Sequence, residues 1–578
     1  MNKPWTTTCL FVATTVAIAV FNNSAAFGQE KKTADLGLSS PDSLTARVDR
    51  LFAEWGTPGS PGCVLGVIRD GKLIYARGYG LANLEYNLPL TPKSVLNIAS
   101  VSKQFTAASI LLLAQRGALS LDDDIRKYVP EIPAYNAEPI TIRHLLNHTS
   151  GIRDWYDLMN LASPIGDLSV GRPIEDADML AVIARQKETN FPPGSEYSYS
   201  NSGYSLLSVI VKRTSGKTLR EFAEANIFAP LGMSHTHFHD DYGMVVPLRA
   251  PGYGARNNGF RKAPEINDPP GPTGLYTSVE DLLLWDQNFY HKKVGGQALQ
   301  DELHRVGVLT SGEKLDHGSG LVLSEYRGLG TVSFDGAWTG YRSFLLRFPQ
   351  QSFSVVCLCN VTSARPGRVS YRVADEYLGE LMTALPERGA VPAGVVLTEA
   401  ELKQRAGIYR NVRTQEVRRI DLTDGTLVVG ARKLTAMDAN RFIGSTTLPP
   451  YEVTFQSVGA APGVRMVEKA GGGKPTTYER MQASTLSVGE LAAYAGNYYS
   501  EELDAVYEIA ADKDLLSVTV RPGRAPLFMA RPTYRDAFMN SVGLMPQFVF
   551  ERDAGGRVFA FRFQLGSVRS IRFVRQPR

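Results

Sequence analysis

The feature that most constrains the fold of this chain is a polar stretch, residues 97–106, that runs directly into an apolar helix, residues 107–114. Ser100 and Lys103 lie three residues apart in it, just under one helical turn, so their side chains share a face. A serine hydroxyl is a poor nucleophile at neutral pH, and a neighbouring lysine accepts its proton only when burial or nearby cations lower the lysine pKa. The spacing therefore predicts Ser100 as a nucleophile and Lys103 as its base.

The same four-residue pattern occurs a second time, at Ser311 and Lys314. This copy lies in a polar stretch that contains glycine, which is typical of a turn. We interpret it as a chance match and expect the chemistry at Ser100.

A second candidate motif places Tyr199 and Asn201 on either side of one residue, on a loop that leads into a predicted helix. A phenol near a lysine can transfer protons, and an amide can orient both the lysine and a substrate carbonyl. The pattern recurs at Tyr409 and Asn411, within a region rich in short strands. The order of the motifs along the chain and the local context favour the copy at Tyr199 and Asn201.

The third motif comprises Phe334, Gly336 and Ala337, where one predicted strand ends and the next begins. Small residues at such a place let a substrate lie along the strand edge, where backbone N–H groups can reach it. The N–H groups of Ser100 and Ala337 are expected to form an oxyanion hole. We therefore predict a substrate-binding segment at residues 334–337.

Together with residues 144–151 and 274–282, these motifs resemble the serine β-lactamase-like and penicillin-binding protein family. That family includes class C β-lactamases, D-alanyl-D-alanine carboxypeptidases, D-aminopeptidases and esterases. The resemblance implies an α+β fold, in which an antiparallel sheet is flanked by helices and carries an inserted helical subdomain, over residues 38–385. It also implies an acyl-enzyme on Ser100, with Lys103 as base, Tyr199 as proton shuttle and Asn201 in contact with the substrate amide. No cofactor or metal is implied.

Phe334 departs from the family pattern, which has lysine or histidine at this place. Without that cation, recognition of a carboxylate beside the scissile bond is not expected, which argues against a β-lactamase or a carboxypeptidase. The sequence favours a hydrolase acting on esters or D-aminopeptidase-like amides of small molecules or peptides. The alternative is a penicillin sensor or binding protein with impaired turnover. We expect Arg342 to pair with Asp335 or to be solvated.

The domain plan follows from changes in composition along the chain. Residues 1–28 are typical of an export signal, with a basic start, an apolar run and a small-residue cleavage site, and predict a periplasmic or secreted protein. A linker rich in proline and glycine is predicted at 386–397. Beyond it, residues 401–409 and 490–498 follow the same pattern, and each is followed by a strand, so we expect two lipocalin-like antiparallel barrels at 398–483 and 484–578.

Composition excludes some other classes of function. The net charge of +4, with acidic and basic residues interspersed, gives no reason to expect nucleic-acid binding. No later apolar run is long enough to span a membrane. Three cysteines remain after the signal, namely Cys63, Cys357 and Cys359, and no disulfide framework is expected from them. The sequence leaves the oligomeric state open.

Several histidines and aromatic residues permit two interpretations. His235, His237 and His239 alternate as metal ligands might, but the surrounding residues are typical of a turn into a strand. His144 and His148 are four apart, yet the glutamate of a zinc helix is absent, and a helix end is favoured. His317 is expected at the surface. Alternating aromatic residues in the second barrel are expected in its core, rather than at a ligand-binding mouth: Tyr498, Tyr499, Phe559, Phe561 and Phe563.

Overall fold

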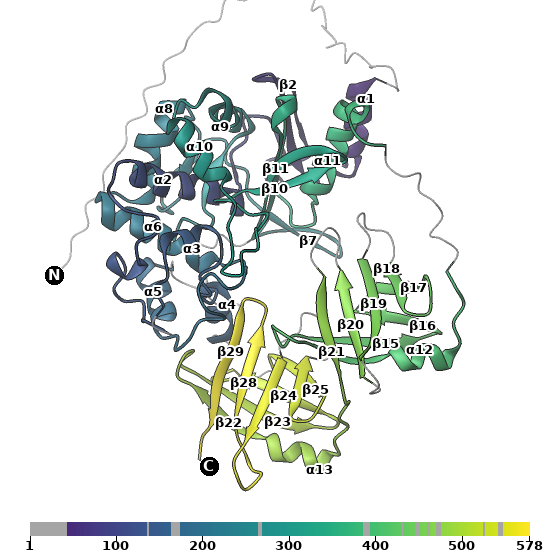
Figure 1. Ribbon diagram of the computed structural model, residues 1–578. Helices are drawn as coiled ribbons and strands as arrows, with labels where there is room; N and C mark the ends of the chain where they lie inside the picture. Colours follow the sequence, from purple (N-terminus) through teal and green to yellow (C-terminus); the bar gives the residue numbers. More distant parts are fainter. Residues whose placement is uncertain are drawn as a thin grey trace, which may run out of the picture.

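The computed structural model comprises a helix-flanked sheet followed by two closed barrels (Figure 1). The predicted signal peptide lies outside the described residues, and so does most of the predicted linker. None of the helices in the described part of the chain is long and apolar enough to cross a membrane. The structure describes residues 43–135, 138–162, 174–263, 269–384, 394–430, 432–444, 451–458, 463–469, 475–523, 526–540 and 547–577.

The first part is built on a six-stranded antiparallel sheet whose strands come from both ends of the domain. Two neighbouring inner strands, β13 and β1, are buried on both faces, and their side chains alternate between two hydrophobic cores. In spatial order the strands are β10 (Val322–Tyr326), β11 (Leu329–Trp338), β12 (Tyr341–Phe348), β13 (Phe353–Cys359), β1 (Cys63–Arg69) and β2 (Lys72–Tyr79).

Helices cover both faces of this sheet. One face packs on α1 (Leu44–Leu51) and α11 (Pro366–Leu378). The other face packs on α9 (Val279–His291), and beyond it lies the helix that follows Ser100, α2 (Lys103–Gln115). Segments between β2 and β10 make the helical subdomain: α3 (Ile142–Leu146), α4 (Trp155–Ala162), α5 (Asp176–Ala184), α6 (Asn201–Ser215), α7 (Leu219–Ala223), a π-helical segment (Glu224–Phe228), α8 (Ala229–Leu231) and α10 (Gly296–His304).

Short strands complete this part: β3 (Leu81–Asn83) with β4 (Leu88–Pro89), β5 (Leu96–Asn97) and β6 (His237–Phe238) on either side of β9 (Leu275–Thr277), and β7 (Tyr253–Arg256) with β8 (Gly259–Lys262). The predicted α+β class, with an inserted helical subdomain, is confirmed. Helices α4 and α10 were not predicted; α10 begins without a side-chain N-cap, so it lacks that start signal.

Each of the two C-terminal parts is a closed barrel, as predicted. The first contains β14 (Gly407–Asn411), β15 (Val417–Thr423), β16 (Thr426–Val429), β17 (Arg432–Ala436), β18 (Arg441–Gly444), β19 (Tyr451–Val458), β20 (Gly463–Lys469) and β21 (Thr476–Met481). The second contains β22 (Gly496–Ser500), β23 (Ala505–Asp512), β24 (Leu515–Val520), β25 (Phe528–Pro532), β26 (Ala537–Asn540), β27 (Gln547–Arg552), β28 (Val558–Leu565) and β29 (Val568–Arg575). A short helix precedes each barrel, α12 (Glu399–Arg405) and α13 (Val488–Leu491).

The repeated sequence pattern corresponds to the helix and first strand of each barrel. Of the five aromatic residues expected in the second core, Tyr498, Phe561 and Phe563 are fully buried. Tyr499 and Phe559 are partly exposed, because they alternate with the inward-facing residues of their strands. The exact domain limits stay predictions.

The second barrel packs directly on the helical subdomain, next to α4 (Figure 1). Leu158 and Leu161 of α4 and Val182 of α5 are buried in the hydrophobic cluster of this barrel. The hydroxyl of Tyr507 donates a hydrogen bond to the carbonyl oxygen of Leu161, at 2.9 Å. Because Trp155, at the other end of α4, is buried in the main core, this helix belongs to two cores at once.

One expectation about the cysteines is wrong. Cys63 and Cys359 form a disulfide, although no disulfide was expected. They begin β1 and end β13, and the antiparallel register of these neighbouring strands places them directly opposite each other. A sequence separation of 296 residues hides this pairing until the sheet is known. Cys357 is a buried free thiol, as its apolar surroundings predicted.

Candidate active site

Ser100 sits in a short 3₁₀ turn, Ala99–Ser102, at the entrance to α2. Ala99 adopts a left-handed conformation, with φ of 50°, which a non-glycine residue keeps only when its surroundings hold it. Two hydrogen bonds fix the turn. The N–H of Ala99 donates to Asn97 Oδ1 at 2.8 Å, and Ser343 Oγ donates to the carbonyl oxygen of Ile98 at 2.6 Å. The turn is thereby tied to the sheet.

The hydroxyl of Ser100 lies between two polar groups. Lys103 Nζ is 3.3 Å from Ser100 Oγ, and the phenol of Tyr199 donates a hydrogen bond to the same oxygen at 2.8 Å. The structure thus brings together the three residues predicted to carry the chemistry. A nucleophile in hydrogen-bond reach of a base, with a second proton carrier on the other side, is the arrangement that acyl transfer requires.

Lys103 is fully buried, although its side chain ends in an amine. Its Nζ also donates to Asn201 Oδ1 and to the carbonyl oxygen of Pro272, both at 2.9 Å. Burial lowers the pKa of Lys103 to about 7, while the negative charges of Asp154 and Asp335 act in the opposite direction. An amine with this pKa is neutral in a large fraction of molecules at neutral pH, as a general base must be.

The pKa of Tyr199 is shifted in the opposite direction from that of Lys103. Burial raises the pKa of its phenol well above the ordinary value of 10, so the group keeps its proton at neutral pH. Its ring lies between the Lys103 ammonium, 4.7 Å from the ring centroid, and the imidazole of His148, at 4.6 Å between centroids. Tyr199 is therefore suited to donate a proton in the resting enzyme, while Lys103 accepts one.

Asn201 is the first residue of α6, and a buried carboxylate behind it holds the start of that helix. Asp154 Oδ2 accepts a hydrogen bond from the N–H of Asn201 at 2.5 Å, and its Oδ1 accepts one from the N–H of Tyr156 at 3.0 Å. Burial raises the pKa of Asp154 to about 6, and the nearby Asp157 acts in the same direction. This residue was missed by the sequence analysis, because no spacing pattern links it to Asn201.

The third motif lies on β11, beside the turn that carries Ser100. Gly336 faces that turn so closely that a Cβ there would lie 2.4 Å from the carbonyl oxygen of Ile98. Ala337 follows on the same strand, and Ser100 is in the first turn of its helical segment, whose N–H groups have no intrahelical acceptor. The two predicted oxyanion-hole donors are thus on neighbouring segments.

The side chain of Phe334 does not line the substrate-binding segment. Its side chain is 5% exposed and packs in the main hydrophobic core, so it supplies neither a charge nor an open contact surface. Arg342 does not replace the missing cation, and it does not form the expected ion pair with Asp335. Its Nη1 donates to the carbonyl oxygens of Trp338 and Tyr341.

The duplicate motifs lie elsewhere. Ser311 and Lys314 are exposed residues in a turn, as expected. Tyr409 and Asn411 belong to β14 of the first barrel.

His317 is closer to the site than predicted. It was expected to be a surface residue, but its side chain is only 20% exposed. Its ring packs on that of Tyr197, with 4.3 Å between centroids, and its Nδ1 lies 2.6 Å from Asp316 Oδ1. Tyr197 is two residues before Tyr199, so the pair of Asp316 and His317 borders the site.

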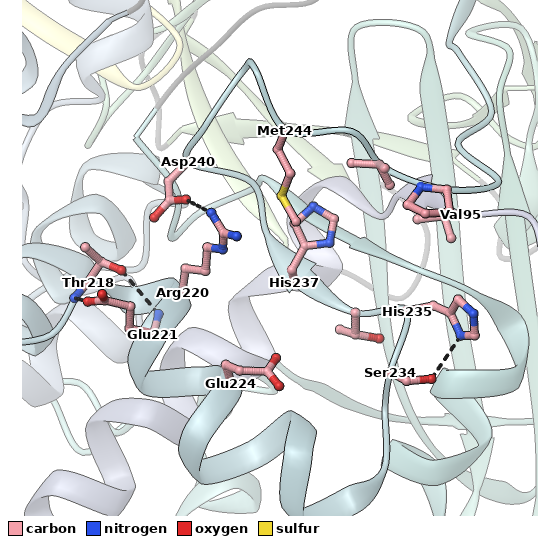
Figure 2. Close-up of a pocket in the computed structure, with 13 residues that line it drawn as sticks. Val95, Thr218, Arg220, Glu221, Glu224, Ser234, His235, His237, Asp240 and Met244 are labelled. Atoms are coloured by element: carbon pink, nitrogen blue, oxygen red, sulfur yellow. Dashed lines mark hydrogen bonds and ion pairs between the residues drawn. The ribbon is translucent and has the colours of Figure 1, made fainter.

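The histidines near residue 237 line a separate pocket (Figure 2). Figure 2 shows Glu224 and His237 directed into it, and Arg220 paired with Asp240 at 3.0 Å. Burial lowers the pKa of His237 to about 4. Within the described residues, the sole group close enough to hold a metal ion consists of the three cysteines, two of which form the disulfide.

Comparison with known proteins decides the family. The family model described as Beta-lactamase matches residues 48–378, more than half of the chain. The chain belongs to the β-lactamase family. The matched range includes all the residues of the candidate site.

Curated relatives of this β-lactamase-family protein include a penicillin-binding protein and D-aminopeptidases. It is 30% identical over 308 residues to penicillin-binding protein 4* of Bacillus subtilis, covering 50% of this chain and 66% of the relative. It is 29% identical over 333 residues to a D-aminopeptidase of Gluconobacter oxydans, covering 56% and 60%. The chain thus spans less than two thirds of the length of these relatives.

Solved structures support the fold. A structure titled as the octameric penicillin-binding protein homologue from Pyrococcus abyssi matches with a TM-score of 0.53 and 23% identity, over 76% of this chain and 99% of that one. The D-amino acid amidase of Ochrobactrum anthropi SV3 matches with a TM-score of 0.51 and 20% identity, over 59% and 100%. At these identities the likeness concerns the fold alone.

Proposed function

We propose that this protein is an exported serine hydrolase that forms an acyl-enzyme through Ser100 on esters or on D-aminopeptidase-like amides. The observation that carries the proposal is the position of Ser100 Oγ, within hydrogen-bond reach of both Lys103 Nζ and the Tyr199 phenol. Membership of the β-lactamase family and the D-aminopeptidases among the relatives support it. The disulfide between Cys63 and Cys359 supports export, because disulfides persist mainly outside the cytoplasm.

In the first half-reaction, neutral Lys103 takes the proton of Ser100 as Oγ attacks the substrate carbonyl carbon. The oxyanion that forms is stabilised by the N–H groups of Ser100 and Ala337, and losing one such donor typically costs about 10²–10³ in rate. Tyr199 gives its proton to the leaving amine or alkoxide as the bond to the carbonyl carbon breaks. The proton held by Lys103 then returns to the phenolate through bound water, because Ser100 Oγ is esterified in the acyl-enzyme.

In the second half-reaction, water attacks the ester on Ser100 while neutral Lys103 takes up its proton, and Lys103 gives this proton to Ser100 Oγ as the bond to the acyl carbon breaks. The acid product leaves, and Ser100 recovers its hydrogen. The net reaction consumes one water and releases an acid and an amine or alcohol. Asn201 holds Lys103 and lies where it can contact the acyl amide of a bound substrate.

The burial of Phe334 favours one alternative, a penicillin sensor that acylates but turns over slowly. A site without a cation at this place lacks one means of binding a carboxylate and of lowering the pKa of its neighbours. The sensor would retain the nucleophile and lose efficient deacylation.

One experiment separates the two. The purified protein is treated with a fluorophosphonate or a labelled penicillin, and the adduct on Ser100 is located by mass spectrometry. Turnover is then measured with p-nitrophenyl acetate and D-alanine p-nitroanilide. Turnover that is lost in Ser100→Ala but kept in Ser311→Ala supports the hydrolase. Labelling of Ser100 without turnover supports the sensor, and absence of both contradicts the proposal.

A further inference from the structure

The outer edge of β11 is open where it passes the nucleophile. Strand β10 pairs with β11 only along Leu329–Ser333, and the segment before β10 turns away, so that Gly320 packs against the backbone of Lys103 and Gln104. Residues 334–338 therefore have β12 on one side, and Gly336 among them packs against the turn that carries Ser100. A substrate held by the N–H of Ala337 lies along this edge.

Asp335 is the charged side chain on this edge. It stands between buried Phe334 and close-packed Gly336, and its own side chain is exposed. Within the described residues its carboxylate has no hydrogen bond or ion pair, since Arg342 donates to backbone carbonyls instead. The second acid nearby, Asp316, is already engaged with His317 at 2.6 Å. Asp335 thus keeps its capacity to bind a cation.

The negative charge of Asp335 affects the pKa values of the groups around Ser100. It raises the pKa of Lys103, Tyr199 and Tyr197. Tyr199 is the proton donor to the leaving group in the proposed mechanism. A leaving group that receives this proton therefore approaches both the phenol and the open carboxylate.

We propose that Asp335 is a specificity-determining residue that selects substrates whose leaving group carries a positive charge, and that it repels leaving groups carrying a carboxylate. The inference rests on the proposed hydrolase function and names its substrate class. A lysine or histidine at position 334 would bind a carboxylate of the substrate. In this chain Asp335 gives the site a preference for the opposite charge. A charged pair that is partly shielded from water gains from the lower effective dielectric, and the effect weakens as salt is added.

The competing role for Asp335 is purely structural or electrostatic support of Lys103. That role changes the base and so affects every substrate by the same factor, and it shifts the pH profile. Selection by charge affects substrates differently according to the charge of the leaving group. The two roles are separated by comparing substrates that share one acyl group.

Three thioesters provide that comparison: acetylthiocholine, its uncharged isostere S-(3,3-dimethylbutyl) thioacetate, and 3-(acetylthio)propionate. Release of the thiol is followed with a chromogenic disulfide, and kcat/KM is measured for each. The wild-type protein is expected to favour the cation over the isostere by about tenfold. Asp335→Asn is expected to remove this preference by raising KM for the cation relative to KM for the isostere, so that the ratio of the two kcat/KM values approaches one. Asp335→Lys is expected to favour the anion.

Asp316→Asn is the matched control, because it removes an exposed charge that, like that of Asp335, acts on Tyr197, and it leaves Asp335 in place. It is expected to keep most of the preference, and added salt is expected to reduce the preference in both the wild type and Asp316→Asn. Equal effects of Asp335→Asn on all three thioesters, or no wild-type preference, would overturn the inference. If Ser100-dependent hydrolysis of the isostere persists in that case, the hydrolase function stands. If no thioester is hydrolysed and Ser100 is not labelled, both proposals fail.

Discussion

Arg153 and Glu502 form a buried ion pair that joins the helical subdomain to the second barrel, with 2.5 Å between Nη1 and Oε1. The Arg153 side chain is fully buried and that of Glu502 is 6% exposed. Arg153 immediately precedes Asp154, which binds the N–H of Asn201, and Asn201 in turn binds Lys103. A continuous chain of contacts thus leads from the barrel to Lys103.

Removing the Glu502 charge should therefore destabilise the protein. Glu502→Gln removes the close and buried counter-charge of the Arg153 guanidinium and leaves Glu188, which is 3.6 Å away and 43% exposed. Breaking a buried pair from one side costs about 3–5 kcal/mol. Chemical denaturation followed by fluorescence measures the change in the free energy of unfolding. Glu501→Gln is the control, because its ion pair with Lys187 is exposed and worth at most about 1 kcal/mol. Similar effects of both variants would contradict the prediction.

The pH dependence should follow Lys103. Its pKa is lowered to about 7, so the neutral amine, and with it kcat/KM for p-nitrophenyl acetate, increases as pH rises through about 7. Lys103→Arg should lower activity at all pH values by about 10²–10⁴, because a guanidinium cannot act as a base at neutral pH. A profile without an ascending limb near 7 would rule out Lys103 as the base.

Folding stability has a related pH dependence. The unfolded lysine keeps its proton up to its ordinary pKa of 10.5, while the folded one loses it near 7. The unfolded state therefore binds more protons between these values, and the contribution of Lys103 to stability increases with pH in that window. Denaturation at several pH values, compared between the wild type and Lys103→Met, isolates this contribution.

Asp154 should affect the pH dependence of activity through the pKa of Lys103. Its negative charge raises the pKa of Lys103, opposing the effect of burial. Asp154→Asn keeps the size of the side chain and removes the charge, so the ascending limb of the pH profile is expected to move to lower pH. The measurement is kcat/KM for p-nitrophenyl acetate from pH 5 to 9. A limb that stays in place or moves upward would be inconsistent with this role.

Tyr199→Phe should discriminate between ester and amide substrates. The variant keeps the ring that packs on Lys103 and His148 and removes the proton donor. An amine leaving group needs that proton, whereas p-nitrophenolate leaves without it. Activity on D-alanine p-nitroanilide should fall about 10²–10⁴-fold, and that on p-nitrophenyl acetate much less. Equal losses on both substrates would remove Tyr199 from the proton-donor role.

The disulfide should make stability sensitive to reductant. Cys63 and Cys359 close a loop of nearly the whole first domain, and such a cross-link typically contributes about 2–5 kcal/mol. Thermal unfolding should shift to lower temperature with dithiothreitol or in Cys63→Ala/Cys359→Ala. Cys357→Ala controls for the loss of a buried sulfur, and its unfolding should remain sensitive to reductant.

Local patterns revealed much of the site before the structure was known. Ser100 and Lys103 share one helical turn, and Tyr199 and Asn201 are two residues apart, so short-range spacing sufficed for each pair. Contacts that join distant segments were not visible. The carbonyl of Pro272 reaches Lys103 across 169 residues, and the disulfide joins positions 296 apart.

The same reasoning explains the errors in detail. Phe334 was placed in the substrate-binding segment because of its position in the motif, but strand alternation turns its ring into the core and leaves Asp335 outside. His317 was placed at the surface because it precedes a strand, yet the ring of Tyr197 covers it. In both cases the neighbour that decides the burial comes from another part of the chain.

Helix α4 has a consequence for any attempt to shorten this protein. Leu158, Leu161 and Val182 are covered by the second barrel, so a version ending at the linker would present these apolar side chains to water. It would also leave the Arg153 guanidinium without Glu502. The first domain and the second barrel therefore share a buried interface, and we expect a version without the second barrel to be less stable than the full chain.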